Sequence, residues 1–354
     1  MTNIDNYTDS AIKLLKKLIM TPSFSEEEEG VVKIIETWFT ENEIIYERHL
    51  NNLWAKNKFF DNEKPTILLN SHHDTVKPNK SFTFDPFEPI IEDGKLYGLG
   101  SNDAGGALVS LLHSFKNIYL REKMKYNIII AATAEEETAG KNGISSILDK
   151  IPNIDFAIIG EPTLMDLAVA ERGLIVFDAK IKGTPSHAAH QNNDNAIEKV
   201  PEFFNWLNSL EFERISEFLG PVKITLTQIN AGYQHNVIPS EVNFVIDVRV
   251  NELYTNTEIN RVFTKECPCE IKARSLNLKS SFIDLDNNLV NAARSLGIKL
   301  YGSPTLSDQA QLNFPSVKIG PGDSKRSHSA NEFIFIDDIT NGIDTYNNLL
   351  NKIL

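Results

Sequence analysis

The feature that most constrains the fold is an alternation of short apolar runs with segments of helical periodicity. Apolar, β-branched runs predict strands near residues 66–71, 127–134 and 155–160, and helical patterns lie between them near 104–118 and 143–149. Parallel neighbours in a sheet need a crossover connection, which is usually a helix. The sequence therefore predicts an α/β fold with a mostly parallel sheet and helices on both faces.

Helical periodicity also covers residues 9–50, before the alternation begins. Ser23 and Ser25 stand just before the second periodic stretch of this region, and the stretch opens with acidic residues. Serine is a common N-cap, and acidic side chains favour the first turn of a helix. We expect these serines to cap the second helix.

The pattern changes after Glu171 and predicts a second domain inserted into the first. Residues 173–279 read as strand, helix, strand, strand, helix, strand, which is the split βαβ arrangement of a small ferredoxin-like α+β domain. Helical patterns then return near 287–296 and at the C-terminus. We therefore predict a discontinuous main domain over residues 1–172 and 280–354.

Charge and apolar run length exclude several classes of partner. The formal net charge is -13, and no stretch concentrates Lys and Arg, so nucleic acid and anionic membranes are poor partners. The longest apolar runs are far shorter than the roughly 20 residues that span a bilayer, and the N-terminus lacks the pattern of a secretory signal. We predict a cytoplasmic protein in which Cys267 and Cys269 are incidental thiols.

Histidines and carboxylates gather where the predicted strands end. In "ILLNSHHDTVKP" a strand is followed by His72, His73 and Asp74. Side chains alternate along a strand, which favours His72 and Asp74 as one working pair. Four further stretches place metal-type ligands in loops: "GLGSNDAGG", "TAEEETAG", "GEPT" and "RSHSANE". Open α/β sheets bind ligands beyond the carboxyl ends of their strands, so we expect all five stretches to converge on one crevice.

With these five ordered motifs, essentially the whole chain resembles the dinuclear zinc amidohydrolase and peptidase family. That family contains acetylornithine deacetylase, succinyl-diaminopimelate desuccinylase, aminoacylase and glutamate carboxypeptidase. The resemblance implies a metal-dependent catalytic domain with two Zn²⁺ ions per subunit, for which Co²⁺ or Mn²⁺ are plausible substitutes. Residues 173–279 would then be a dimerisation or lid domain.

The resemblance also assigns roles to individual residues. It implies that Asp103 bridges the two metals, that a cis peptide follows it, and that Asp74 orients a ligand from behind. The implied metal ligands are His72, Asp103, Glu137, Glu161 and His328. Glu136 falls on the general base, although Glu135 replaces the usual aspartate and a shift of one position would misassign both Glu136 and Glu137.

Three residues of the inserted domain match family positions near the substrate. The resemblance implies that His187 stabilises the oxyanion across a homodimer interface, and that Asn236 and Arg249 contact the substrate. Arg249 suits a bidentate grip on an α-carboxylate. Alternatively, Asn236 holds a turn and Arg249 forms a surface ion pair.

Two loops depart from or add to the family pattern. Gly105 stands where the family often has lysine after the bridging aspartate. Lys325 and Arg326 directly precede His328, where they could attract an anionic acyl group, although exposed loop cations more often only aid solubility.

The motif wording resembles the acetylornithine deacetylase branch most. This implies hydrolysis of N-acetyl-L-ornithine to L-ornithine and acetate in arginine biosynthesis. The alternatives are deacylation of N-succinyl-ornithine or N-acetylcitrulline, succinyl-diaminopimelate desuccinylation, and dipeptide hydrolysis. From another class, a catalytically silent homologue could bind the same small molecules.

Overall fold

The computed structural model describes residues 3–354, which form two compact units. The first unit runs to Val169 and continues over Phe282–Tyr301 and Ser307–Leu354, and the second comprises Ala170–Ser281 and Gly302–Leu306. None of the described helices is both long and apolar enough to cross a bilayer.

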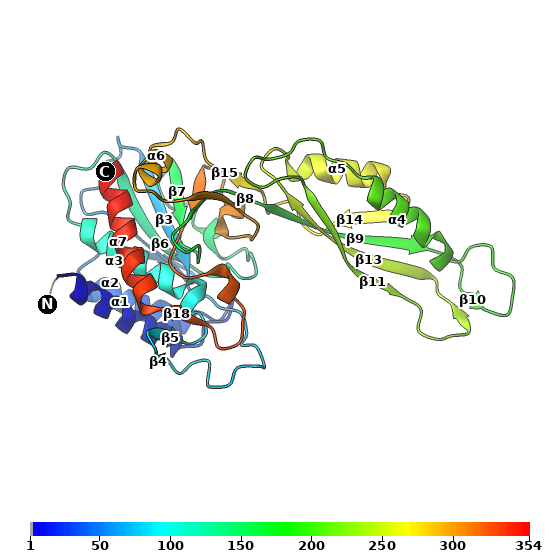
Figure 1. The fold of residues 1–354 in the computed structure, drawn as a ribbon, viewed down its shortest axis with the longest axis horizontal. Helices are drawn as coiled ribbons and strands as arrows, with labels where there is room; N and C mark the ends of the chain where they lie inside the picture. Colours follow the sequence, from blue (N-terminus) through cyan, green and yellow to red (C-terminus); the bar gives the residue numbers. More distant parts are fainter. Residues whose placement is uncertain (1–2) are drawn as a thin grey trace. The chain divides into compact units, whose positions relative to one another are not determined.

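The first unit is built around the large sheet (Figure 1). Its strand order is β1 (Tyr46–His49), β2 (Asn52–Lys56), β6 (Asn127–Thr133), β3 (Thr66–His72), β7 (Phe156–Ile159), β17 (Ser316–Lys318), β8 (Leu167–Glu171) and β15 (Ser281–Phe282), and β16 (Leu300–Ser303) also pairs with β8. The pairs within β6–β3–β7–β17 are parallel, whereas β1–β2, β2–β6 and β17–β8 are antiparallel. The predicted α/β fold with a mostly parallel sheet is confirmed.

The central strands are buried on both faces, which explains their continuous apolar sequences. Every residue of β3 and β6 is buried. Helices α1 (Asn3–Ile19), α3 (Gly106–Ile118) and α7 (Ile336–Ile353) pack against one another, and α3 lies against β3 and β6 (Figure 1). The unit also contains α2 (Glu29–Glu41), α6 (Asn288–Ser295) and a small sheet of β18 (Phe333–Phe335), β5 (Lys95–Tyr97) and β4 (Ile90–Glu92).

Two local predictions in this unit are wrong. The helix expected near 143–149 is only a short 3-10 turn, Ile144–Ser146; Ile144 and the following Ile147 belong to one buried apolar cluster with Leu68 and Ile129 of the sheet. The second helix begins at Glu29 without a side-chain cap, because the chain first turns after a bridge between Phe24 and Thr75. Ser25 instead donates its hydroxyl hydrogen to Asp74 Oδ2 at 2.7 Å.

The second unit has the predicted ferredoxin-like arrangement. Its chain order is β9 (Gly173–Lys182), α4 (Val200–Ser209), β11 (Lys223–Ala231), β13 (Glu241–Val250), α5 (Asn256–Glu266) and β14 (Glu270–Ala273), with the sheet order β11–β13–β9–β14. Burial alternates along β13, so one face of this sheet packs on the helices through Phe203, Phe244 and Phe263 (Figure 1). Cys267 and Cys269 are free thiols of this unit.

Candidate metal centre

The candidate site lies where three parallel strands end. His72 is the last residue of β3, Glu136 and Glu137 follow β6, and Glu161 follows β7. Because β3 pairs in parallel with both β6 and β7, these loops leave the sheet at the same edge. Three of the five stretches that were expected to converge therefore lie at this edge of the sheet.

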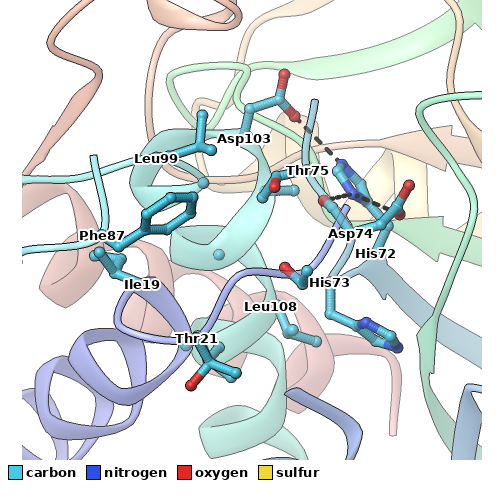
Figure 2. Close-up of a pocket in the computed structure, with 15 residues that line it drawn as sticks. Ile19, Thr21, His72, His73, Asp74, Thr75, Phe87, Leu99, Asp103 and Leu108 are labelled. Carbon is cyan, nitrogen blue, oxygen red and sulfur yellow. Dashed lines mark hydrogen bonds and ion pairs between the residues drawn. The ribbon is translucent and has the colours of Figure 1, made fainter. Parts of the chain in front are cut away.

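Asp103 occupies the centre of the site. It lies in the turn Ser101–Gly105, where its own backbone is extended with φ -119° and ψ 99°, and the Asp103–Ala104 peptide is cis. Its Oδ1 atom is 3.3 Å from His72 Nε2, and its Oδ2 atom is 3.7 Å from His328 Nε2 (Figure 2 shows Asp103 facing His72). The two oxygens of one carboxylate therefore face two different histidines.

Further carboxylates complete the surroundings of each histidine. Glu161 Oε1 is 3.8 Å from His72 Nε2, and Glu137 Oε2 is 2.9 Å from His328 Nε2. We call His72, Asp103, Glu136, Glu137, Glu161 and His328 together the His-carboxylate cluster. Ligand atoms of His72, Asp103 and Glu137 lie within 4.8 Å of one another, and so do those of His72, Glu136 and Glu161.

The donor atoms of the cluster fit divalent cations. Zinc binds imidazole nitrogen and carboxylate oxygen at about 2.0–2.2 Å, so donors around one tetrahedral ion are separated by about 3.3–3.6 Å. The contacts of His72 with Asp103 and Glu161 are close to this spacing. A set of nitrogen and oxygen donors without thiolate is compatible with Zn²⁺, Co²⁺ and Mn²⁺.

Asp74 organises the cluster from behind. His72 Nδ1 donates to the Asp74 backbone oxygen at 3.0 Å, and this bond orients the ring so that Nε2 faces Asp103 Oδ1 at 3.3 Å. The Asp74 carboxylate accepts the backbone N–H groups of Glu136 at 3.0 Å and Glu137 at 3.2 Å. One buried carboxylate thus fixes the orientation of a histidine and the start of a glutamate loop.

His73 points the other way, as the strand parity predicts (Figure 2). Its Nε2 atom lies 2.9 Å from the backbone oxygen of Asn51. Burial lowers the pKa of His73 to about 4, so its imidazole is neutral near pH 7.

The three consecutive glutamates differ in environment. Glu135 has a positive φ of 54°, and its carboxylate accepts hydrogen bonds from the Asn142 backbone at 3.1 Å and the Asn142 side chain at 2.7 Å. Glu136 and Glu137 instead reach the cluster, where Glu136 Oε2 is 3.9 Å from His72 Nε2. Glu135 therefore braces the loop while its two neighbours face the histidines.

The cluster is electrostatically crowded without a cation. Burial raises the pKa of Glu136 and of Glu161 well above the usual range, and neighbouring carboxylates add to both shifts. The hydrogen bond with Glu137 raises the pKa of His328 to about 9. Protons on these groups must leave when a metal ion binds, so metal affinity falls as the pH decreases.

Adding Zn²⁺ to the metal-free protein will therefore raise its Tm. A ligand that binds only the folded state stabilises it by about 2.7 kcal/mol when its free concentration is 100 times Kd. Differential scanning calorimetry with increasing Zn²⁺, followed by excess chelator, measures this shift and its reversal. A Tm independent of both additions would contradict a metal centre.

Two buried acids that the sequence did not single out support this edge of the sheet. Glu332, the last residue of the "RSHSANE" stretch, accepts three backbone N–H groups from the Asp103 turn. Asp308 Oδ2 accepts hydrogen bonds from Asn70 Nδ2 at 2.8 Å and Thr133 Oγ1 at 2.9 Å, and burial raises its pKa to about 6. No local pattern marks Asp308, because its partners are distant in the sequence.

Of the two cationic residues that precede His328, Arg326 is bound within the fold. The Arg326 guanidinium pairs with Asp338 at 3.2 Å and lies 4.7 Å and 4.8 Å from the ring centroids of Phe333 and Phe335. Lys325 is exposed and forms no ion pair within residues 3–354. Of these two residues, only Lys325 therefore remains available to attract an anionic acyl group.

The glycine that replaces the family's lysine has a steric reason. A Cβ atom at Gly105 would overlap the carbonyl oxygen of Gly100 and lie 2.6 Å from Leu15 Cδ1. The turn after Asp103 is thus packed too closely here for a lysine side chain.

The remaining candidate residues belong to the second unit. His187 in β10 (Ser186–His187) is exposed and pairs with Val237 of β12 (Val237–Ile238), which places Asn236 next to it in the ribbon. Asn236 accepts the Ala188 N–H at its backbone oxygen, whereas its buried Oδ1 atom has no partner within the described chain. Arg249 donates to both carboxylate oxygens of Asp247, at 2.8 Å and 3.1 Å, so its fork is already engaged.

Comparisons with known proteins agree with this architecture. The model of peptidase family M20/M25/M40 matches residues 68–352. Succinyl-diaminopimelate desuccinylases of Wolbachia pipientis wMel and Psychromonas ingrahamii are each 26% identical to this chain. Both alignments cover 97% of this chain, and they cover 95% and 98% of the two relatives, respectively.

Solved structures share the fold at lower identity. A dinuclear metal-binding M20 peptidase from Bacillus subtilis matches with a TM-score of 0.73 and 18% identity over 98% of both chains. A tripeptidase from Staphylococcus aureus matches with a TM-score of 0.76 and 20% identity over 98% of both chains.

Proposed function

Because the chain belongs to peptidase family M20/M25/M40, we propose that it hydrolyses the amide bond of an N-acyl-amino acid at the His-carboxylate cluster. The observation that carries this proposal is Asp103, whose two oxygens face His72 and His328. A carboxylate in this position can serve two cations while its charge screens their repulsion. The arrangement therefore favours metal-dependent hydrolysis over a silent binding role.

In this proposal the cluster residues divide into ligands and a base. His72, Asp103 and Glu161 would hold one divalent cation, and Asp103, Glu137 and His328 would hold the other. Two such cations supply Lewis acidity toward the amide carbonyl and acidify the attacking water. Glu136 accepts the proton of that water and later delivers it to the leaving amine.

The acyl group of the substrate has two candidates, acetyl and succinyl. N-Acetyl-L-ornithine is the substrate that the motif wording favours, with a place in arginine biosynthesis and in the cytoplasm. The desuccinylase names of the relatives support an N-succinyl-amino acid as the second candidate. The exposed Lys325, three residues before His328, offers a positive charge for a succinyl carboxylate.

The test is the release of free amine by the Zn²⁺- or Co²⁺-loaded protein from N-acetyl-ornithine, N-succinyl-ornithine, N-acetylcitrulline, succinyl-diaminopimelate and a dipeptide. Preference for an acetyl compound supports the first candidate, and preference for a succinyl compound supports the second. Cleavage of the dipeptide alone would contradict an N-acyl-amino acid substrate.

The second unit contributes a dimer interface and an oxyanion donor in the same proposal. The homodimer stays a prediction, supported by β11, a nine-residue strand at the sheet edge whose side chains are mostly exposed. His187 would donate from the partner subunit to the oxyanion, with Asn236 beside it in the ribbon.

Replacing His187 by alanine will lower kcat far more than it raises KM. Loss of one oxyanion donor reduces kcat by about 10²–10³-fold in other hydrolases. His190→Ala is the matched control, because its ring lies 5.8 Å from that of His187 in the same loop. Steady-state kinetics of both variants decide the matter, and an unchanged kcat in His187→Ala would restrict this loop to a structural role.

A further inference from the structure

Glu332 is a buried carboxylate bound by backbone N–H groups of one turn. The residue is 2% exposed. Oε1 accepts the N–H groups of Asn102 at 2.8 Å and Asp103 at 2.9 Å, and Oε2 accepts that of Gly100 at 3.0 Å. The Glu332 backbone oxygen also accepts the Gly98 N–H at 3.0 Å. Side chain and backbone of one residue thus hold the whole turn that carries Asp103.

The position of Glu332 in the chain links this turn to a second loop. Glu332 follows His328 by four residues and directly precedes β18. Its three hydrogen bonds therefore join the His328 loop to the Asp103 turn, which lies more than two hundred residues earlier in the sequence. The relative placement of these two segments sets the distance between Asp103 Oδ2 and His328 Nε2, which is 3.7 Å.

Fold stability alone gives a weak reason for an acid at this position. A buried carboxylate is costly unless strong hydrogen bonds satisfy it, and here a second carboxylate, Asp103, lies close by. A neutral side chain would avoid this repulsion, but it would not accept three converging N–H donors.

We propose that Glu332 is a positioning residue that fixes Asp103 between His72 and His328, so that one carboxylate serves both metal positions. The inference rests on the proposed function. Glu332 plays for the Asp103 turn the part that Asp74 plays for the Glu136–Glu137 loop, where a carboxylate also accepts consecutive backbone N–H groups. Residues behind metal ligands typically change metal affinity 10–100-fold when they are replaced.

The experiment is a calorimetric Zn²⁺ titration of metal-free wild type, Glu332→Gln and Glu332→Asp. Glutamine keeps the shape but turns an amide donor toward one of the N–H groups, and aspartate keeps the charge but is one methylene shorter. We expect about 10–100-fold weaker Zn²⁺ binding in both variants. Asp155→Asn is the matched control, because Asp155 accepts one backbone N–H, that of Thr66 at 2.8 Å, at the opposite end of β3.

The visible spectrum of the Co²⁺-loaded proteins gives a second readout, since it reports coordination geometry rather than fold. We expect changed Co²⁺ bands in the Glu332 variants and an unchanged spectrum in Asp155→Asn. Wild-type affinity and spectrum in both Glu332 variants would overturn the inference. The wild-type titration separates the two proposals: two sites per chain support the proposed function, whereas no binding overturns it together with the inference.

Discussion

Replacing Glu136 by glutamine will reduce kcat by about 10²–10⁴-fold, the usual contribution of a general base or acid. The structure gives the reason, because Glu136 Oε2 lies 3.9 Å from His72 Nε2 while the Glu136 backbone is held by Asp74. Glutamine keeps the size of the side chain but cannot accept a proton from water. The bound metal should stay at two ions per chain, as measured by elemental analysis.

Glu135→Gln is the matched control for this prediction. Glu135 is the neighbouring acid in the same loop, but its carboxylate is bound to Asn142 rather than directed at the histidines. We expect its kcat to stay far closer to that of the wild type. The opposite pattern, with loss of turnover in Glu135→Gln and full turnover in Glu136→Gln, would show that the glutamate register is shifted by one.

Replacing Asp103 by asparagine will have an equally large effect, but through metal content. Two divalent cations bring four positive charges, against three negative charges from Asp103, Glu137 and Glu161. The variant loses one of these charges and one of the oxygens that face His72 and His328. Loss of one Lewis acid removes several kcal/mol of transition-state stabilisation, or about 10³-fold in kcat.

Metal content distinguishes this variant from the base variant. Elemental analysis after gel filtration should give fewer than two Zn²⁺ ions per chain for Asp103→Asn and two for Glu136→Gln. Two tightly bound ions in Asp103→Asn would contradict the bridging role. A circular dichroism spectrum like that of the wild type serves as the control for folding.

The sequence predicted those parts of the structure that depend on local pattern. Fully buried strands such as β3 have continuous apolar sequences, and the loops after them contain the histidines and acids. The half-buried sheet of the second unit shows alternation along β13. Strand parity also separated His72 from His73 correctly, because side-chain direction in an extended segment is a local property.

The failures concern residues whose surroundings come from distant segments. The isoleucines near residue 147 have helical spacing, but they pack individually on the sheet around a single turn. Ser25 looked like a helix cap and is instead bonded to Asp74, and Arg326 looked free and is paired with Asp338. Glu332 resembles an ordinary polar residue before a strand, because its hydrogen-bond donors lie about 230 positions away.

The most direct test of the account is a crystal structure of the Zn²⁺-loaded protein with anomalous diffraction data at the zinc absorption edge. A two-metal centre bridged by Asp103 will give two anomalous peaks per chain, one among His72, Asp103 and Glu161 and the other among Asp103, Glu137 and His328. A single peak, or peaks that do not share Asp103 as a ligand, would contradict a two-metal centre bridged by this residue.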